Sequence, residues 1–222
     1  MKHLLLAIIG AVSLIIPGST YGTPSDMNGD SRADLVFQNS AGQIYVWYMD
    51  GAGSPIAGEY LYQGGLGDWQ IVGITDMDGD FNADLVFQNN VGQMYVWYMD
   101  GAGNVIWGEY LYAGGLGDWR VVGVKDMDGD FNADLVFQNC AGQIYVWYMD
   151  GAGGAIWGEF LYTGGLGDWR IAGITDMDGN SRADLVFQNS AGQIYVWYMD
   201  GAGSAIWGEY LYAGGLGDWI VR

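Results

Sequence analysis

Short runs of β-branched and aromatic residues, separated by glycine-rich polar turns, make up most of the chain. In the stretch that starts at Asp76, four such runs occupy residues 83–89, 93–99, 105–112 and 119–124. Runs of this length and composition between turn residues predict β-strands. No segment has the apolar spacing that an amphipathic helix requires. The pattern therefore predicts an all-β protein.

The second of these runs has apolar residues on both of its faces. From Met94 to Met99 the sequence reads Met-Tyr-Val-Trp-Tyr-Met, with no alternation of apolar and charged positions. A strand of this kind has both faces covered in the folded protein. We therefore expect each sheet to be packed between two others.

The whole pattern repeats four times with a period of 50 residues. The string ADLVFQN begins at Ala33, Ala83, Ala133 and Ala183, and the units start near residues 26, 76, 126 and 176. A four-stranded sheet packed on each side by its own copies is a propeller blade. The sequence predicts a β-propeller of four four-stranded blades over residues 23–222. A β-solenoid is the alternative, but its coils are shorter than 50 residues.

The two ends of this region complement each other. Residues 219–222 begin the strand that each unit places last, and residues 23–25 match the end of that strand. The prediction is a closed ring, formed either by the four blades of one chain or by blades shared between chains.

The first 22 residues have the organisation of a secretory signal peptide. A basic start is followed by an apolar run at residues 4–16, then by Pro17, and by small residues up to Gly22, after which cleavage is expected. A membrane anchor is the alternative, but 13 apolar residues fall short of the roughly 20 that span a bilayer. The prediction is a protein that is secreted, or located in the periplasm.

The excess of acidic over basic residues indicates which kinds of partner the chain can bind. The chain has 7 Lys and Arg against 26 Asp and Glu, a net charge of −19. Nucleic acids and anionic membranes would repel such a chain, whereas cations would be attracted. The single Cys excludes an internal disulfide, and the single His, His3, lies in the signal peptide.

The clearest chemical motif is an acidic nonapeptide before each ADLV strand. Oxygen-bearing side chains fall at its positions one, three, five and nine. A hard cation such as Ca²⁺ takes six to eight oxygen ligands, several of them charged. Close carboxylates also repel one another unless a cation or protons neutralise them. Up to four Ca²⁺ ions are therefore expected, on Asp26, Asn28, Asp30 and Asp34; Asp76, Asp78, Asp80 and Asp84; Asp126, Asp128, Asp130 and Asp134; and Asp176, Asp178, Asn180 and Asp184. Ordinary polar turns are the alternative interpretation.

This loop, followed by ADLVFQN and GQIYVWYMDG, resembles the FG-GAP/VCBS repeat family of integrin-α-like propellers and secreted bacterial proteins. The resemblance implies calcium in the loops, with position-seven carbonyls of Arg32, Asn82, Asn132 and Arg182 as further ligands, and roles in adhesion or carbohydrate binding. Two features depart from the family. Position six is Ser31, Phe81, Phe131 or Ser181 instead of Gly, and family rings commonly have seven blades.

Tryptophans offer candidate ligand surfaces. The sets that contain Trp97 and Trp119 recur in every unit and are assigned to packing between blades. Trp107, Trp157 and Trp207 differ, because the first unit has Ala57 at that position. On an outer strand they could stack on a sugar ring or simply pack at the sheet edge.

The sequence favours a binding protein over an enzyme. After signal cleavage no His is left for a Ser-His pair, and no GxSxG motif occurs. Every acid recurs in near-identical surroundings, whereas glycoside hydrolysis needs two unlike carboxylates. We expect a multivalent, lectin-like or adhesive module for a glycan or an extracellular protein, which could form homo-oligomers by ring closure. The alternative is a purely structural repeat module.

Overall fold

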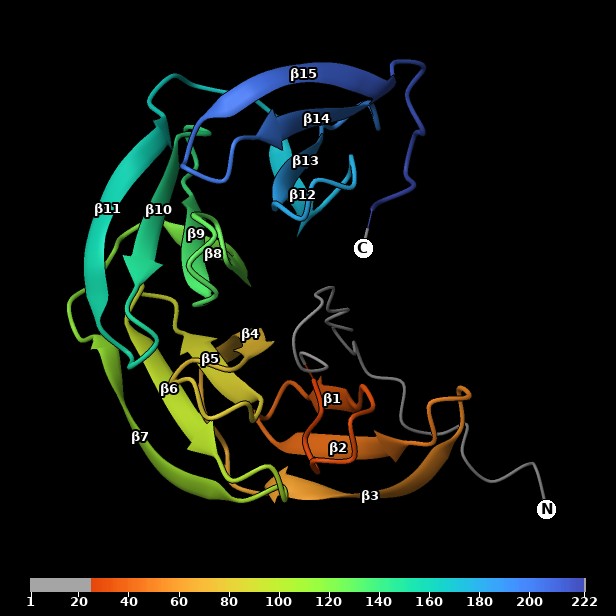
Figure 1. Cartoon of the computed structure of the whole chain (residues 1–222), viewed down its shortest axis with the longest axis vertical. Coiled ribbons are helices and arrows are strands. Elements are labelled where there is room, and N and C mark those ends of the chain that lie inside the picture. The colour runs from red at the N-terminus through yellow and green to blue at the C-terminus, as the bar shows by residue number, and fades with distance from the viewer. Residues whose placement is uncertain (1–24, 222) are drawn as a thin grey trace.

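The computed structural model of the chain describes residues 25–221, which form fifteen antiparallel strands in four sheets arranged around a common centre (Figure 1). The predicted all-β propeller with four blades is confirmed. The predicted signal peptide lies outside the described residues. Residues 25–221 contain no helix with the length and hydropathy of a membrane span.

Each blade is one meandering sheet. The first contains β1 (Leu35–Gln38), β2 (Ile44–Met49) and β3 (Pro55–Tyr62). The second contains β4 (Gln70–Thr75), β5 (Asp84–Gln88), β6 (Met94–Met99) and β7 (Val105–Tyr112). The third contains β8 (Arg120–Lys125), β9 (Asp134–Gln138), β10 (Ile144–Met149) and β11 (Ala155–Tyr162). The fourth contains β12 (Arg170–Thr175), β13 (Asp184–Gln188), β14 (Ile194–Met199) and β15 (Ala205–Tyr212).

A blade does not coincide with one sequence repeat. In the second blade the order from the centre outwards is β4, β5, β6 and β7, so the inner strand is the last strand of the preceding unit (Figure 1). Each blade is therefore covalently tied to its neighbour through the loop that leads into its inner strand. In the described residues the first blade has three strands and lacks an inner one.

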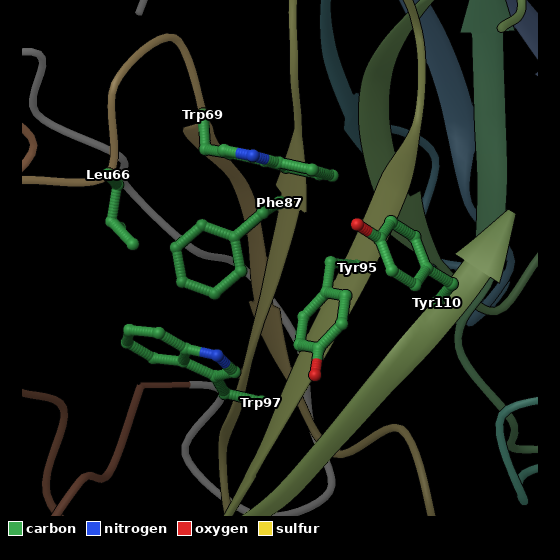
Figure 2. Close-up of a pocket in the computed structure, with 6 residues that line it drawn as sticks. All are labelled: Leu66, Trp69, Phe87, Tyr95, Trp97 and Tyr110. Carbon is green, nitrogen blue, oxygen red and sulfur yellow. The ribbon is translucent and has the colours of Figure 1, made fainter. Parts of the chain in front are cut away.

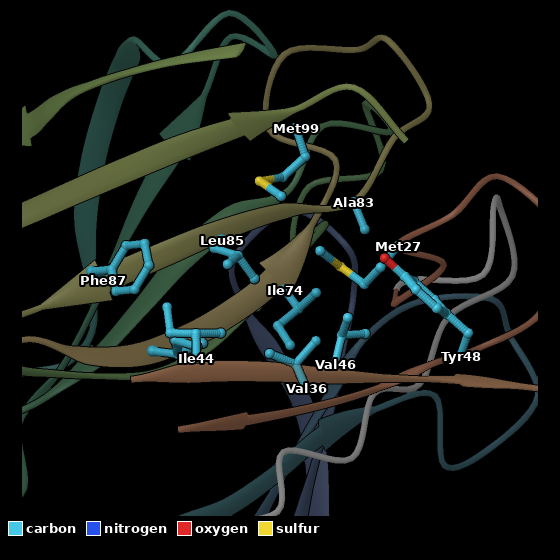
Figure 3. Packing of buried hydrophobic residues seen from close by; sticks show 11 residues of the cluster. Met27, Val36, Ile44, Val46, Tyr48, Ile74, Ala83, Leu85, Phe87 and Met99 are labelled. Carbon is cyan, nitrogen blue, oxygen red and sulfur yellow. The ribbon is translucent and has the colours of Figure 1, made fainter. Parts of the chain in front are cut away.

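The hydrophobic core lies between the blades. Figure 3 shows the first of these layers, where Val36 and Val46 of the first blade face Ile74 and Leu85 of the second. Val46 and Leu85 are fully buried. Fully burying a side chain of this size contributes about 1.5–3 kcal/mol. The apolar residues on both faces of β6 are used in this way, since the second blade lies between the first and the third.

A glutamine side chain fastens each blade to the next. In the first blade Gln38 donates from Nε2 to the carbonyl oxygen of Trp69 at 2.8 Å and accepts from the N–H of Ile71 at 2.9 Å. Gln88 and Gln138 make the same pair of bonds to the following inner strands. These bonds fix where the inner strand of the following blade begins.

Candidate functional site

The acidic loops connect each inner strand to the next strand of the same blade, and their first aspartate folds them. Asp76 accepts from the N–H of Gly79 through Oδ1 at 2.7 Å and from the N–H of Phe81 through Oδ2 at 2.9 Å. Short side chains that bond to the following backbone favour tight turns over regular strands. This folding draws the oxygen atoms of the loop together on one side.

The ninth residue of each loop is a buried aspartate with a structural role. Asp84 has none of its surface exposed and accepts from the N–H of Met77 at 2.8 Å and of Met99 at 2.9 Å. It thereby joins the loop to the end of β6. Burial raises the pKa of Asp84 to about 7, although the two backbone bonds oppose this shift. Asp134 has the same partners in its own blade, and burial raises its pKa to about 7 as well.

Three carboxylates converge in each of three loops. Oxygens of positions one, three and nine lie within 4.8 Å of one another in the sets Asp76, Asp78 and Asp84; Asp126, Asp128 and Asp134; and Asp176, Asp178 and Asp184. Burial is also the main cause that raises the pKa of Asp78 and Asp128, and neighbouring carboxylates add to it. A bound divalent cation would neutralise the buried charges and the repulsion between the carboxylates. Carboxylate oxygens are also the ligands that Ca²⁺ takes. The residues present therefore fit a calcium ion.

The remaining predicted ligands are arranged differently. Asp80, at position five, lies outside the converging group and accepts from the N–H and the side-chain amide of Asn82, both at 2.8 Å. The first loop contains no group of three carboxylates among the described residues, because Asn28 stands at position three. There Arg32 forms an ion pair with Asp30 at 3.2 Å. Whether position five, the position-seven carbonyls and the first loop bind an ion stays a prediction.

Position six of the loop has the backbone conformation that glycine adopts most easily. Phe81 and Phe131 have φ of 69° and 74°, and Ser31 and Ser181 have φ of 65° and 66°. The left-handed region costs a residue with a Cβ about 1–2 kcal/mol. The loop thus keeps its geometry without the usual glycine, at the expense of local strain.

Replacement of Phe81 by glycine is expected to relieve this strain. Phe81 is 86% exposed, so little packing is lost. We expect Phe81→Gly to stabilise the calcium-loaded protein by up to about 1 kcal/mol, since the greater entropy of glycine in the unfolded chain offsets part of the gain. Urea unfolding with calcium present measures the effect. The matched control is Val91→Gly, also at an exposed position, which should destabilise; a loss of stability in Phe81→Gly would contradict strain at this position.

The three tryptophans proposed as sugar platforms lie on outer strands with one face covered. Trp107 on β7 stacks on Tyr98 of β6, with ring centroids 4.7 Å apart, and is 51% exposed. Tyr98 is held in place because its hydroxyl donates to Glu109 at 3.0 Å. Trp157 and Trp207 stack in the same way on Tyr148 and Tyr198. Each presents one open face, at equivalent positions of three blades.

The structure also contains an aromatic pocket that the sequence did not reveal. Figure 2 shows this pocket, of about 190 Å³, in the second blade; Leu66 and Trp69 come from the loop before β4, and Phe87, Tyr95, Trp97 and Tyr110 come from β5, β6 and β7. The third blade has a pocket of the same volume, lined by Leu116, Trp119, Phe137, Tyr145, Trp147 and Phe160. The sequence assigned these tryptophans to packing, which is half of their role, because they also form pocket walls. The signal that could have found them is the Trp that ends each glycine-rich GGLGDW loop.

Comparison with known proteins finds a family match for part of the chain. Residues 26–87 match the profile of the FG-GAP-like repeat, in agreement with an FG-GAP-like repeat family. The matched segment contains the first acidic loop, β1 to β4 and the second acidic loop. A search of curated proteins found no match.

Proposed function

We propose that this chain, with its FG-GAP-like repeat, is a secreted calcium-binding propeller that acts as a multivalent binding and adhesion module for glycans. The observation that carries the proposal is the recurrence of one aromatic surface in successive blades at equivalent positions. Several weak and equal sites on one rigid body gain affinity for a repetitive ligand such as a cell-surface glycan.

Calcium has a supporting role in this proposal. The converging carboxylates of each loop would hold the ion, which would supply the positive charge that neutralises them. Asp84 links this site to the end of β6 through its bond to Met99. An occupied loop would therefore stabilise the blade that carries Trp107. The same holds for Asp134 in the third blade, which bonds to Met149.

The aromatic surfaces suit a sugar ring better than a charged ligand. The C–H face of a sugar packs on an aromatic face, and the hydroxyls at its rim need polar partners. Trp107 offers such a face, and the pocket of the same blade, on the other face of the sheet, is lined in part by Tyr95 and Tyr110. A volume of about 190 Å³ is below the 300–1,000 Å³ of pockets for drug-sized ligands. It suits a single ring at the end of a glycan.

The proposal assigns no catalytic role to the chain and places it outside the cytoplasm, because residues 1–22 have the pattern of a signal peptide. An extracellular protein that displays exposed sugar-like or aromatic groups is the alternative ligand. Nucleic acid is not an expected partner, because the net charge is −19.

A glycan array probed in calcium and in chelator tests this function. We expect calcium-dependent binding to a defined set of glycans. The triple variant Trp107→Ala, Trp157→Ala, Trp207→Ala should lose at least tenfold in apparent affinity, since loss of one aromatic stack costs about 1 kcal/mol and the effects multiply across sites. The matched variant Tyr110→Ala, Phe160→Ala, Tyr210→Ala removes residues of similar exposure, two of which line the pockets of the second and third blades, while Tyr210 is their equivalent in the fourth.

Comparison of the two variants locates the binding surface. Loss of binding only in the tyrosine and phenylalanine variant would move the site from the outer strands to the pockets. An array without any hit, in a protein whose circular dichroism is native, would contradict glycan binding and favour a structural repeat module.

A further inference from the structure

The three complete junctions between blades share one pattern of aromatic contacts. At the end of each outer strand a tyrosine packs against a tryptophan of the next blade: Tyr62 on Trp97, Tyr112 on Trp147 and Tyr162 on Trp197, with ring centroids 5.4–5.5 Å apart. The loop that follows then places a tryptophan on an aromatic pair of that next blade. Trp69, for example, lies 6.3 Å from Tyr95 and 6.1 Å from Tyr110.

The first blade displays one half of this junction. Tyr45 and Tyr60 form the same T-shaped pair, with centroids 4.8 Å apart, as Tyr95 and Tyr110 do in the second blade. Within the described residues no tryptophan lies on the pair, and β1 has no neighbour on its inner edge. Leu35 and Phe37 of β1 are consequently only half-buried, whereas their equivalents Leu85 and Phe87 are buried.

The fourth blade displays the other half. Tyr212 is 44% exposed, and Trp219 is 75% exposed with no ring partner in residues 25–221. A Cβ at Gly73 or Gly123 would overlap the neighbouring inner strand, but one at Gly173 would meet only Val186, at 3.9 Å. The side of β12 that faces the next inner strand is therefore open.

The segment that would fill the junction is already in position. Gln188 donates to the carbonyl oxygen of Trp219 at 2.7 Å and accepts from the N–H of Val221 at 2.9 Å. These are the two bonds with which Gln38 fixes the start of β4. Residues 219–221 are thus held as the beginning of an inner strand, although no strand within residues 25–221 pairs with them. Figure 1 shows β1 and this segment on either side of the open part of the ring.

We infer that a second copy of this chain occupies the junction: the segment 219–221 of one copy adds to β1 of the other as the inner strand of its first blade. By the register of β4 on β5, in which Ile71 pairs with Phe87, Val221 would pair with Phe37 of the second copy. Trp219 would then lie on the Tyr45–Tyr60 pair, and Tyr212 on Trp47.

The second copy is preferred as the occupant because both halves of the junction are exposed on one chain and do not meet each other. The half-junctions are complementary in shape, in apolar character and in unpaired backbone. Unpaired strand edges of this kind pair with other chains. The contact is head-to-tail, so it leaves a free half-junction at each end until a ring closes. Two copies supply eight blades, within the range of four to eight that propellers adopt. This inference does not depend on the ligand of the proposed function.

Cysteine cross-linking of the full chain tests the inference. One chain carries Phe37→Cys and a second carries Val221→Cys, each with Cys140→Ser to remove the exposed native thiol. Directly paired residues in a sheet lie within the Cα distance that a disulfide spans. Mild oxidation of the mixture should give a disulfide-linked product of twice the chain mass, and oxidation of either chain alone should give far less. A single chain with both substitutions that cross-links as a monomer would overturn the inference, because its own ends would then close the ring.

The mass of the native particle gives the second measurement. Light scattering on the wild type should give at least two chains per particle, and Trp219→Ala should raise the dissociation constant by at least tenfold, as expected for a central tryptophan of an interface. Trp207→Ala is the matched control, since Trp207 is 52% exposed on the same blade but lies outside the junction. A monomeric wild type at micromolar concentration, or equal effects of the two variants, would contradict a second copy at this surface.

Discussion

Removal of divalent cations with a chelator is expected to lower the melting temperature of this protein by about 15 °C or more. Three loops bring three carboxylates within 4.8 Å of one another. If calcium is present at about 100 times its dissociation constant, each occupied site contributes about 2.7 kcal/mol, so three contribute about 8 kcal/mol. For a domain of this size, 1 kcal/mol corresponds to about 2–4 °C in melting temperature. Differential scanning calorimetry in calcium and in EDTA measures the difference.

The difference in melting temperature between calcium and chelator should depend on pH. The pKa of Asp84 and of Asp134 is raised to about 7, above the ordinary value of 3.8 that applies in the unfolded chain. Between about pH 4 and pH 7 the metal-free folded state therefore binds protons that the unfolded state has released, and its stability falls as the pH rises through this window. Calcium binds the ionised carboxylates, so the stabilisation by calcium should grow over the same window.

Two outcomes would contradict calcium in the loops. The first is a melting temperature that the chelator leaves unchanged at pH 7.5, together with an elemental analysis that finds no divalent metal. The second is an equal effect of calcium at pH 5 and at pH 7.5. Magnesium at the same concentration is the control for general screening of charge, because it demands a strict octahedral geometry and dehydrates reluctantly.

Replacement of Asp84 by alanine is expected to destabilise the protein by about 3–5 kcal/mol even without metal. The change removes the acceptors of two N–H groups, those of Met77 and Met99, which are buried. Each buried donor left without a partner costs about 1–3 kcal/mol, and the small cavity adds to this. Urea unfolding in chelator at pH 5 measures the loss, because burial keeps the Asp84 carboxyl protonated there and no buried charge offsets the lost hydrogen bonds.

Asp80→Ala is the matched control for this variant. Asp80 lies in the same loop, is exposed, and its side chain accepts hydrogen bonds from Asn82. In chelator we expect it to cost about 0.5 kcal/mol or less, as is usual for a substitution at the surface that breaks no buried hydrogen bond. Asp84→Asn keeps one acceptor oxygen and should fall between the two. Equal losses for Asp84→Ala and Asp80→Ala would show that the buried bonds to Met77 and Met99 do not stabilise the fold.

The acidic loops show how far sequence reasoning reached at the site. The spacing of aspartates identified positions one, three and nine, which do converge. It could not show that Asp84 also bonds to Met99, fifteen residues away, because that contact depends on the pairing of β5 with β6. Nor could it separate Asp80 from the converging group, since the direction of its side chain is set by the bonds to Asn82.

The aromatic residues have roles that sequence reasoning did not predict. Trp69 recurs in every unit and was assigned to packing, yet it also forms a wall of the pocket in the second blade. The Trp that ends each GGLGDW loop marks one wall, but the sequence could not place the other walls beside it, because they come from three strands that lie next to this loop only in the folded blade. The position of Trp107 on an outer strand was expected, but its stacking on Tyr98 was not.

The sequence by itself determined the repeat, the all-β class and the position of the strands to within one or two residues. These features are local: a period of 50 residues, β-branched and aromatic runs, and glycine turns act on neighbouring residues of the chain. Only the tertiary structure decided which strand completes which blade, and that residues 219–221 and β1 face an open junction. These are decided by the angle at which successive sheets pack, which depends on side-chain volumes at every junction together and is not encoded in any single repeat.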